Sequence, residues 1–189
     1  MIHHSQLIEH GFFIADFPLS EDVLEMLKNR QWKDLDQYFL TISLNDGPLR
    51  NFLQNFLDFQ TLEHIIAIRS APLDEEGIWH DDGSRFLGFS LSLNIFPETI
   101  SGGELHFKKK NEITGPTFPP LPIGKMLIFL SGVYGYEHKV TIYEHHELMR
   151  ELELVGLYGK LNIVPGVAGS TVFEVHTFYQ KNSGLSFWY

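Results

Sequence analysis

The stretch that decides the fold class runs from Arg85 to Phe96 and reads RFLGFSLSLNIF. Apolar side chains alternate there with small or polar ones, and a period of two residues is typical of a β-strand. Similar short runs lie on both sides of it, separated by glycine and proline turns, and they cover residues 11–17, 64–69, 102–107, 125–130, 138–143, 152–158, 161–164 and 172–178. Many short strands with such turns predict a sandwich, a jelly roll or a barrel.

The first third of the chain has a different pattern and predicts helices. A helix start is indicated at residues 20–22, where a serine N-cap precedes two carboxylates. Residues 49–57 carry apolar side chains at spacings of three and four, which is typical of an amphipathic helix. We therefore expect a mainly β chain of the α+β class. Residues 1–189 would form one domain, in which a helical part at 1–60 packs outside a β core with further C-terminal strands at 61–189.

The composition narrows the class of protein. Hydrophobic residues make up 43% of the 189 residues and charged residues 20%, which is enough to bury a core and excludes wholesale disorder. Cysteine is absent, so disulfides and thiolate zinc sites are excluded. The net charge of -10 argues against broad nucleic-acid binding. No apolar run approaches the roughly 18 residues of a membrane helix, and the first residues do not resemble a secretory signal, so we expect a cytoplasmic protein without a membrane partner.

The chemistry is concentrated in the sequence WHDDG at residues 79–83. If this stretch is a strand, His80 and Asp82 point to one face and Asp81 to the other, because side chains alternate along a strand. A third ligand is expected on a later strand that faces the same interior, and His138 meets that requirement. Two histidines and one carboxylate that leave open coordination positions are typical of non-haem Fe(II) oxygenases.

Several motifs follow one another in an order that resembles a known family. They are His80-x-Asp82, the arginine-led strand from Arg85, Gly102-Gly103-Glu104, the strand after Pro122-x-Gly124, and His138-x-Val140, preceded by an opening strand at 11–17. The set is similar to the prolyl 4-hydroxylase-like group of Fe(II)/2-oxoglutarate-dependent oxygenases, over roughly residues 8 to 158.

This resemblance implies a fold, a cofactor and a reaction. The fold would be a double-stranded β-helix, that is a cupin-like jelly roll, with the N-terminal helices buttressing one sheet. His80, Asp82 and His138 would bind Fe(II) and form the catalytic centre, with 2-oxoglutarate as cosubstrate and ascorbate as a candidate addition. The reaction would hydroxylate a small-molecule or protein substrate while O2 and 2-oxoglutarate are converted to succinate and CO2.

The family also needs a cation for the distal carboxylate of 2-oxoglutarate. Arg150 is favoured because it follows His138 at close to the family's spacing, and an arginine fork suits a carboxylate. Lys160 is the rival and requires a longer insertion after His138. Arg69 and Ser70 stand where the group often has a tyrosine for the same carboxylate, so Arg69 is a third candidate. The alternative function is a cupin-like metal-containing binding module without oxygenase activity, which has no need of such a cation.

Three further expectations concern the surroundings of these residues. Lys108, Lys109 and Lys110 are expected at a hairpin tip in water. Glu104 is expected to be a structural hairpin residue. Residues 144–147 are expected to form a solvated loop between two strands.

Overall fold

A computed structural model describes residues 2–44, 46–56, 59, 61–69, 77–141, 143–145, 154–162 and 177–181. The α-helices are α1 (Ile2–His10), α2 (Glu21–Lys28), α3 (Trp32–Ser43) and α4 (Pro48–Gln54), and the short 3-10 helices are η1 (Pro97–Thr99) and η2 (Gly132–Tyr134). The strands are β1 (Phe12–Asp16), β2 (Thr61–Arg69), β3 (Leu87–Ser92), β4 (Ile100–Gly102), β5 (Leu105–Lys109), β6 (Thr117–Phe118), β7 (Lys125–Leu130), β8 (Tyr136–Val140), β9 (Tyr143–His145), β10 (Leu154–Asn162) and β11 (Thr177–Lys181). The strands β9, β10 and β11 are described by their backbone pairing alone.

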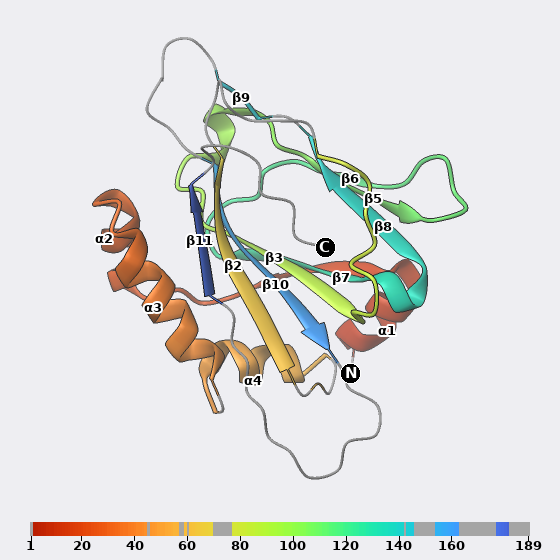
Figure 1. Ribbon diagram of the computed structural model, residues 1–189, viewed down its shortest axis with the longest axis horizontal. Coiled ribbons are helices and arrows are strands. Elements are labelled where there is room, and N and C mark those ends of the chain that lie inside the picture. Colours follow the sequence, from red (N-terminus) through yellow and green to blue (C-terminus); the bar gives the residue numbers. More distant parts are fainter. Residues whose placement is uncertain are drawn as a thin grey trace.

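The described strands form one large and one small sheet, with a separate pair beside them (Figure 1). The large sheet has the order β1-β7-β3-β10-β2-β11, and the small sheet has the order β6-β5-β8. The strands β4 and β9 pair with each other. Neighbours are antiparallel throughout these described ladders except for the parallel pair β2 and β11.

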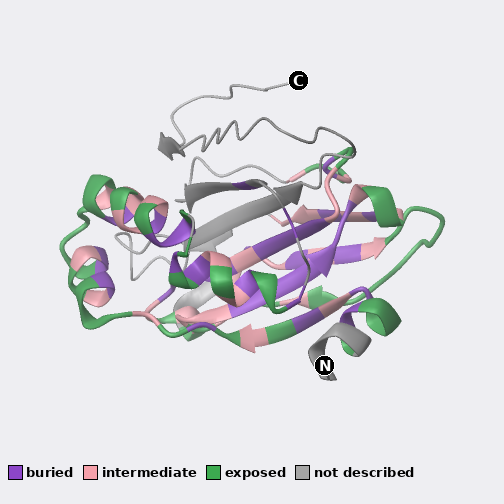
Figure 2. Cartoon of the chain, turned by 90° about the horizontal axis from the view of Figure 1, so that it is seen from below, coloured by how far each residue is buried: buried purple, intermediate pink, exposed green. Residues whose placement is uncertain are grey.

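The strand β1 shows why the large sheet is covered on both faces. Its neighbouring residues Phe12 and Phe13 leave opposite faces, because side chains alternate along a strand. The ring of Phe12 lies 5.8 Å from that of Phe107 in the small sheet, measured between centroids. The ring of Phe13 lies 4.7 Å from that of Phe56, directly after α4. The large sheet therefore packs between the small sheet and the N-terminal helices, and its described buried residues gather along β3 and β7 (Figure 2).

The helices bury one stripe each against this sheet. The buried apolar residues recur at helical spacing and comprise Val23 and Leu27 in α2, Leu35, Phe39 and Ile42 in α3, and Leu49 and Leu53 in α4. Burying each large side chain contributes roughly 1.5–3 kcal/mol, so the helices are held by packing more than by intrinsic propensity. The expected mixture of N-terminal helices and later strands is confirmed. The helices α1 and α3 were not expected as separate elements.

The C-terminal half departs from the sequence expectations in two places. One strand, β10, replaces the two strands expected at 152–158 and 161–164, because β2 and β3 pair with it on both sides and satisfy its backbone without a break. Residues 144–147 were expected to form a loop, but Tyr143–His145 is the strand β9, which pairs with β4. None of the helices in the described part of the chain combines the length and apolarity that crossing a bilayer requires.

Candidate metal centre

His80 and His138 come together across a small antiparallel bridge. The backbone N–H of His80 donates to the carbonyl oxygen of His138 at 3.1 Å, and the N–H of His138 donates to that of His80 at 2.9 Å. Residues that face each other in such a pair project to the same side of the sheet. Their ring centroids accordingly lie 4.2 Å apart, although 57 residues separate them in the chain.

Asp82 completes the group from a tight turn. Candidate ligand atoms of His80, Asp82 and His138 all lie within 4.8 Å of one another. Asp82 Oδ1 is 3.8 Å from Nε2 of His80, and Asp82 Oδ2 is 3.7 Å from Nε2 of His138. The φ angle of Asp82 is 61°, in the left-handed region, which costs a residue with a side chain about 1–2 kcal/mol. A left-handed turn, rather than the expected strand alternation, therefore brings the carboxylate to the histidines.

The ring of His80 is oriented by its own strand. Its Nδ1 lies 3.0 Å from the carbonyl oxygen of Ile78, which can only accept a hydrogen bond. Nδ1 therefore carries a proton, and Nε2 is the ring nitrogen that faces Asp82. The side chains of Asp82 and His138 are 1% and 10% exposed, but that of His80 is 47% exposed. Solvent therefore reaches this group of three residues from the side of His80.

Known proteins can now be compared with this fold and this group. No family model and no curated protein match the chain. A prolyl-4-hydroxylase from Pseudomonas putida matches 86% of this chain and 90% of its own with a TM-score of 0.58 and 20% identity. The chain has the fold of the prolyl 4-hydroxylases.

Two further solved structures agree with that assignment of the fold. A prolyl hydroxylase in complex with a hypoxia inducible factor oxygen degradation domain peptide fragment, from Trichoplax adhaerens, matches 85% of this chain and 87% of its own, with a TM-score of 0.55 and 14% identity. A prolyl 4-hydroxylase from Phytophthora capsici has a TM-score of 0.57 and 14% identity, over 85% of this chain and 61% of its own. The resemblance indicated by the ordered motifs is thus confirmed at the level of the fold.

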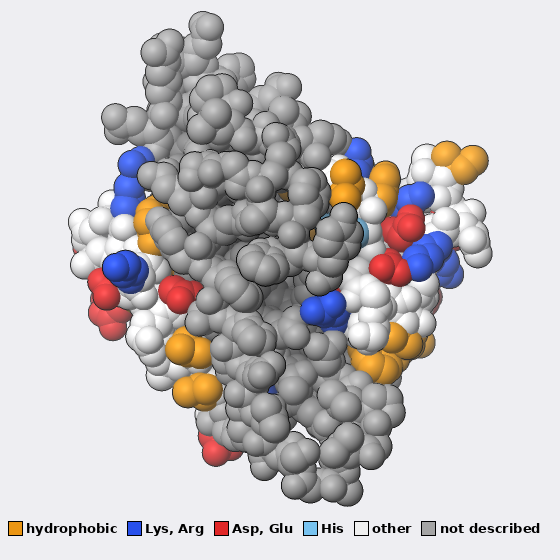
Figure 3. Space-filling model, viewed as in Figure 1, with side chains coloured by type: hydrophobic (Ala, Val, Ile, Leu, Met, Phe, Trp, Pro, Cys, Tyr) orange, Lys and Arg blue, Asp and Glu red, His pale blue; other side chains and the backbone are white. Residues whose placement is uncertain are grey.

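Asp81 points away from the histidines and pairs with Lys110. One carboxylate oxygen of Asp81 binds the ammonium of Lys110, and the other accepts the N–H of Gly83 at 2.9 Å. The hydrogen bond from Lys110 lowers the pKa of Asp81, and the same contact raises the pKa of Lys110. Lys109 and Lys110 are exposed at the end of β5, as expected, whereas Lys108 is partly buried, and Lys110 also connects the metal-site turn to the end of β5. Lys108 Nζ likewise lies 3.4 Å from Glu137, and basic and acidic side chains are interspersed on this side of the molecule (Figure 3).

The Asp81→Ala variant is expected to keep metal affinity within about threefold of wild type, because its carboxylate is directed at Lys110 rather than at the histidines. The lost ion pair is exposed to solvent, so its removal should change the unfolding free energy only slightly. A Co2+ titration of both proteins, with a chelator as competitor, measures the affinity. A loss of more than about 100-fold, beyond what the removal of an orienting group causes, would assign a ligand role to Asp81.

The structure describes the backbone of two of the three candidate cations for the distal carboxylate of 2-oxoglutarate, Lys160 and Arg69. Arg150 lies outside the described residues. Lys160 lies in β10, with Glu63 of β2 and Gly88 of β3 directly opposite it. Arg69 ends β2 opposite Leu154. Gly88 of β3 in turn lies opposite Phe129 of β7, so Lys160, Gly88 and Phe129 form one row across three neighbouring strands.

Two other polar residues, Arg85 and Glu104, form hydrogen bonds near the candidate site or within its strands. Arg85 is half-buried and its Nη1 donates to the carbonyl oxygen of Asp82 at 3.3 Å, so it braces the metal-site turn. Glu104 has a structural role, as expected, because its backbone N–H donates to the hydroxyl oxygen of Thr141 at 2.9 Å and its carboxylate accepts the hydroxyl proton. It does not lie in a hairpin, because β4 pairs with β9 and β5 pairs with β6 and β8.

Sequence reasoning missed the two small residues that follow β7, Ser131 and Gly132. A Cβ atom added to Gly132 would lie 1.9 Å from the carbonyl oxygen of Gly83 and 2.6 Å from that of Asp81. The turn that carries Asp82 therefore rests directly on this glycine. The available signal was a Ser-Gly pair at the end of the buried strand that precedes His138.

The Gly132→Ala variant is expected to lose about 1–3 kcal/mol of unfolding free energy, because a methyl group must displace a packed backbone. It should also weaken metal binding, since the displaced carbonyls belong to the turn of Asp82. Gly135→Ala is the control for metal binding. An added Cβ there meets nothing within 4 Å, so this variant should keep metal affinity even though the φ of 74° strains an alanine. Denaturant unfolding and a Co2+ titration measure the two effects. Wild-type values for Gly132→Ala would show that the turn is not held by this contact.

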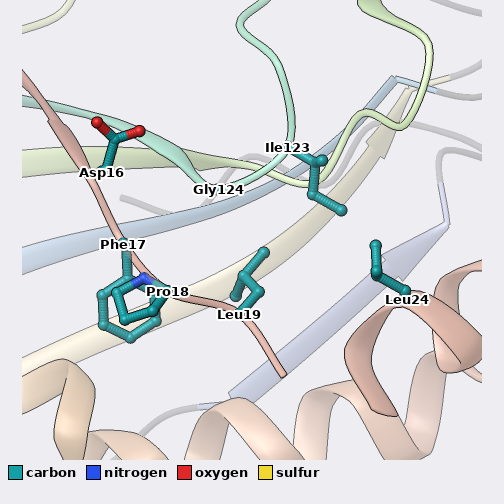
Figure 4. Close-up of a pocket in the computed structure, with 7 residues that line it drawn as sticks. All are labelled: Asp16, Phe17, Pro18, Leu19, Leu24, Ile123 and Gly124. Atoms are coloured by element: carbon teal, nitrogen blue, oxygen red, sulfur yellow. The ribbon is translucent and has the colours of Figure 1, made fainter. Parts of the chain in front are cut away.

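A cavity of about 390 Å3 lies at the other end of β7, between the segment after β1 and the turn before β7 (Figure 4). It is lined by Asp16, Phe17, Pro18, Leu19, Leu24, Ile123 and Gly124. The carboxylate of Asp16 is already paired with Lys125, at 2.6 Å. The six residues of β7 span about 20 Å, so this apolar cavity is separate from the histidine pair.

Proposed function

We propose that the chain is an Fe(II)- and 2-oxoglutarate-dependent dioxygenase that acts as a hydroxylase. One observation carries this proposal: two imidazoles and one carboxylate converge within 4.8 Å in a chain with the fold of the prolyl 4-hydroxylases. Two histidines and one carboxylate with open coordination positions suit Fe(II) in oxygenases.

The donor set fits the metal. Nε2 of His80, a carboxylate oxygen of Asp82 and a ring nitrogen of His138 would hold the iron, and His80 already has the tautomer that a ligand needs. When bound, iron supplies the oxygen chemistry. The chain's own residues orient the ligands and shield two of them from water, since Asp82 and His138 are buried and the ring of Phe129 lies 4.9 Å from that of His138.

We further propose that the two sheets form a double-stranded β-helix, within one oxygenase domain over residues 1–189. Successive strands alternate between the sheets: β3, β7 and β10 belong to the large sheet, whereas β5 and β8 belong to the small one. Residues 77–80 also pair with β8, which extends the small sheet by one more segment. This alternation supports the winding of a jelly roll.

For the cation that binds the distal carboxylate of 2-oxoglutarate, we propose Lys160 ahead of Arg150. Directly opposite residues share one face of a sheet, and Lys160 is connected in this way through Gly88 to Phe129. Phe129 is the residue that packs against His138. The expectation in favour of Arg150 assumed a short connection after Tyr143, whereas β10 begins at Leu154 after the strand β9.

Two observations bear on the substrate class of the proposed enzyme. One structural neighbour is a prolyl hydroxylase in complex with a peptide, which supports a protein or small-molecule substrate for this chain. The net charge of -10 makes nucleic acid the less suitable substrate.

Two measurements test the proposal. Addition of 2-oxoglutarate to the Fe(II)-loaded protein without O2 should produce a visible charge-transfer band, because the keto acid chelates the metal. With O2, the protein should release succinate in an iron-dependent reaction, measured with and without ascorbate, and His138→Ala should release none. Iron binding with neither the band nor succinate would support the cupin-like binding module instead.

A further inference from the structure

The residue after β7, Ser131, is completely buried beneath the turn that carries Asp82. Its exposed fraction is 0%, and its Oγ lies 2.9 Å from the carbonyl oxygen of Asp81 and 3.1 Å from Oδ2 of Asp82. A carbonyl and a carboxylate only accept hydrogen bonds, so the one hydroxyl proton is shared between these two oxygens.

The backbone of Ser131 is fixed on both sides. Its N–H donates to the carbonyl oxygen of Phe86 at 3.0 Å, and its carbonyl oxygen accepts the N–H of Tyr134 at 2.8 Å. The hydroxyl therefore occupies a defined place relative to the histidines. It reaches both the backbone and the side chain of a turn whose central residue, Asp82, has a left-handed φ of 61°.

We infer that Ser131 is a positioning residue for the metal centre: its hydroxyl holds the Asp82 carboxylate at the orientation in which it faces both imidazoles. This inference rests on the proposed metal site. The bond to Oδ2 limits rotation of the carboxylate, whose Oδ1 lies 3.8 Å from Nε2 of His80. Groups that orient a metal ligand typically change metal affinity by 10–100-fold when they are removed.

The experiment compares Co2+ binding to the wild-type chain and to Ser131→Ala. We expect the dissociation constant to rise about 10–100-fold, and the visible ligand-field bands of bound Co2+ to change as the carboxylate loses its fixed orientation. Ser131→Thr keeps the hydroxyl and should restore the wild-type bands. Ser131→Gly is a second variant without the hydroxyl, in case the alanine variant does not fold.

Ser92→Ala is the matched control. Ser92 is also buried, and its hydroxyl donates to the backbone carbonyl oxygen of Leu121 at 2.5 Å, away from the histidine pair. This variant should lose thermal stability without losing metal affinity.

The outcomes separate the inference from the proposed function. Wild-type affinity and bands in a folded Ser131→Ala or Ser131→Gly chain overturn the inference and leave the metal centre intact. Equal losses of affinity in Ser131→Ala and Ser92→Ala also overturn it, because they indicate a general loss of rigidity. Absence of Co2+ binding by the wild-type chain overturns the proposed metal site, and the inference falls with it.

Discussion

Iron binding is expected to disappear when Asp82 or His138 is replaced by alanine. Both side chains are buried, and with His80 they form the described group of three that could hold one metal ion. Loss of a group that merely orients a ligand costs about 10–100-fold in affinity, so loss of a ligand itself should cost more than about 100-fold. His80→Ala should have a similar effect. Anaerobic Fe(II) titration should give one ion per wild-type chain and none for these variants.

A thermal measurement provides an independent check on the same sites. A ligand at 100 times its dissociation constant stabilises the folded state by about 2.7 kcal/mol, so saturating metal should raise the Tm of the wild-type chain. The Tm of His138→Ala should not respond to metal. His106→Ala is the matched control, because this histidine lies on β5 beside Thr117 and outside the group. If the three alanine variants keep the wild-type stoichiometry and affinity, the ligand set is wrong.

Affinity for 2-oxoglutarate is expected to fall at least about tenfold in Lys160→Ala. A hydrogen bond to a charged group contributes roughly 1.5–3 kcal/mol, and each 1.4 kcal/mol is a factor of about ten in the dissociation constant. Iron affinity should stay close to wild type, because the ammonium would bind the distal carboxylate and not the ion. Titration of the Fe(II)-loaded protein with 2-oxoglutarate, without O2, measures both quantities.

Two further variants decide between the candidate cations. Arg150→Ala should leave 2-oxoglutarate affinity close to wild type, and the reverse pattern would make Arg150 the anchor. Glu63 of β2 lies directly opposite Lys160 of β10 in the backbone register, and opposite charges at such positions stabilise a sheet. If Glu63→Gln and Lys160→Ala both lower stability while cosubstrate affinity does not change, Lys160 has only that structural role. If none of these changes affects 2-oxoglutarate binding, the binding module becomes the better account.

Elements with a regular local pattern could be predicted from the sequence. The start of α2 and both bounds of β7 were expected close to where they are observed, because burial on one face imposes a repeat that is visible in the residues themselves. The helix α3 carries such a repeat in Leu35, Phe39 and Ile42, but no separate helix was expected there. Neither β9 nor the unbroken β10 could be predicted in this way, because pairing with distant strands decides both.

For the candidate metal group, too, the sequence determined one part and the tertiary structure the other. The sequence by itself determined which residues carry metal-binding chemistry, because imidazole and carboxylate groups at His80, Asp82 and His138 belong to the side chains whatever the fold. Only the tertiary structure decided how they meet. The bridge between His80 and His138 depends on backbone pairing of distant segments, and the place of Asp82 depends on a left-handed turn packed on Ser131 and Gly132. Such contacts leave no repeat in the sequence, because each is formed once and between residues far apart in the chain.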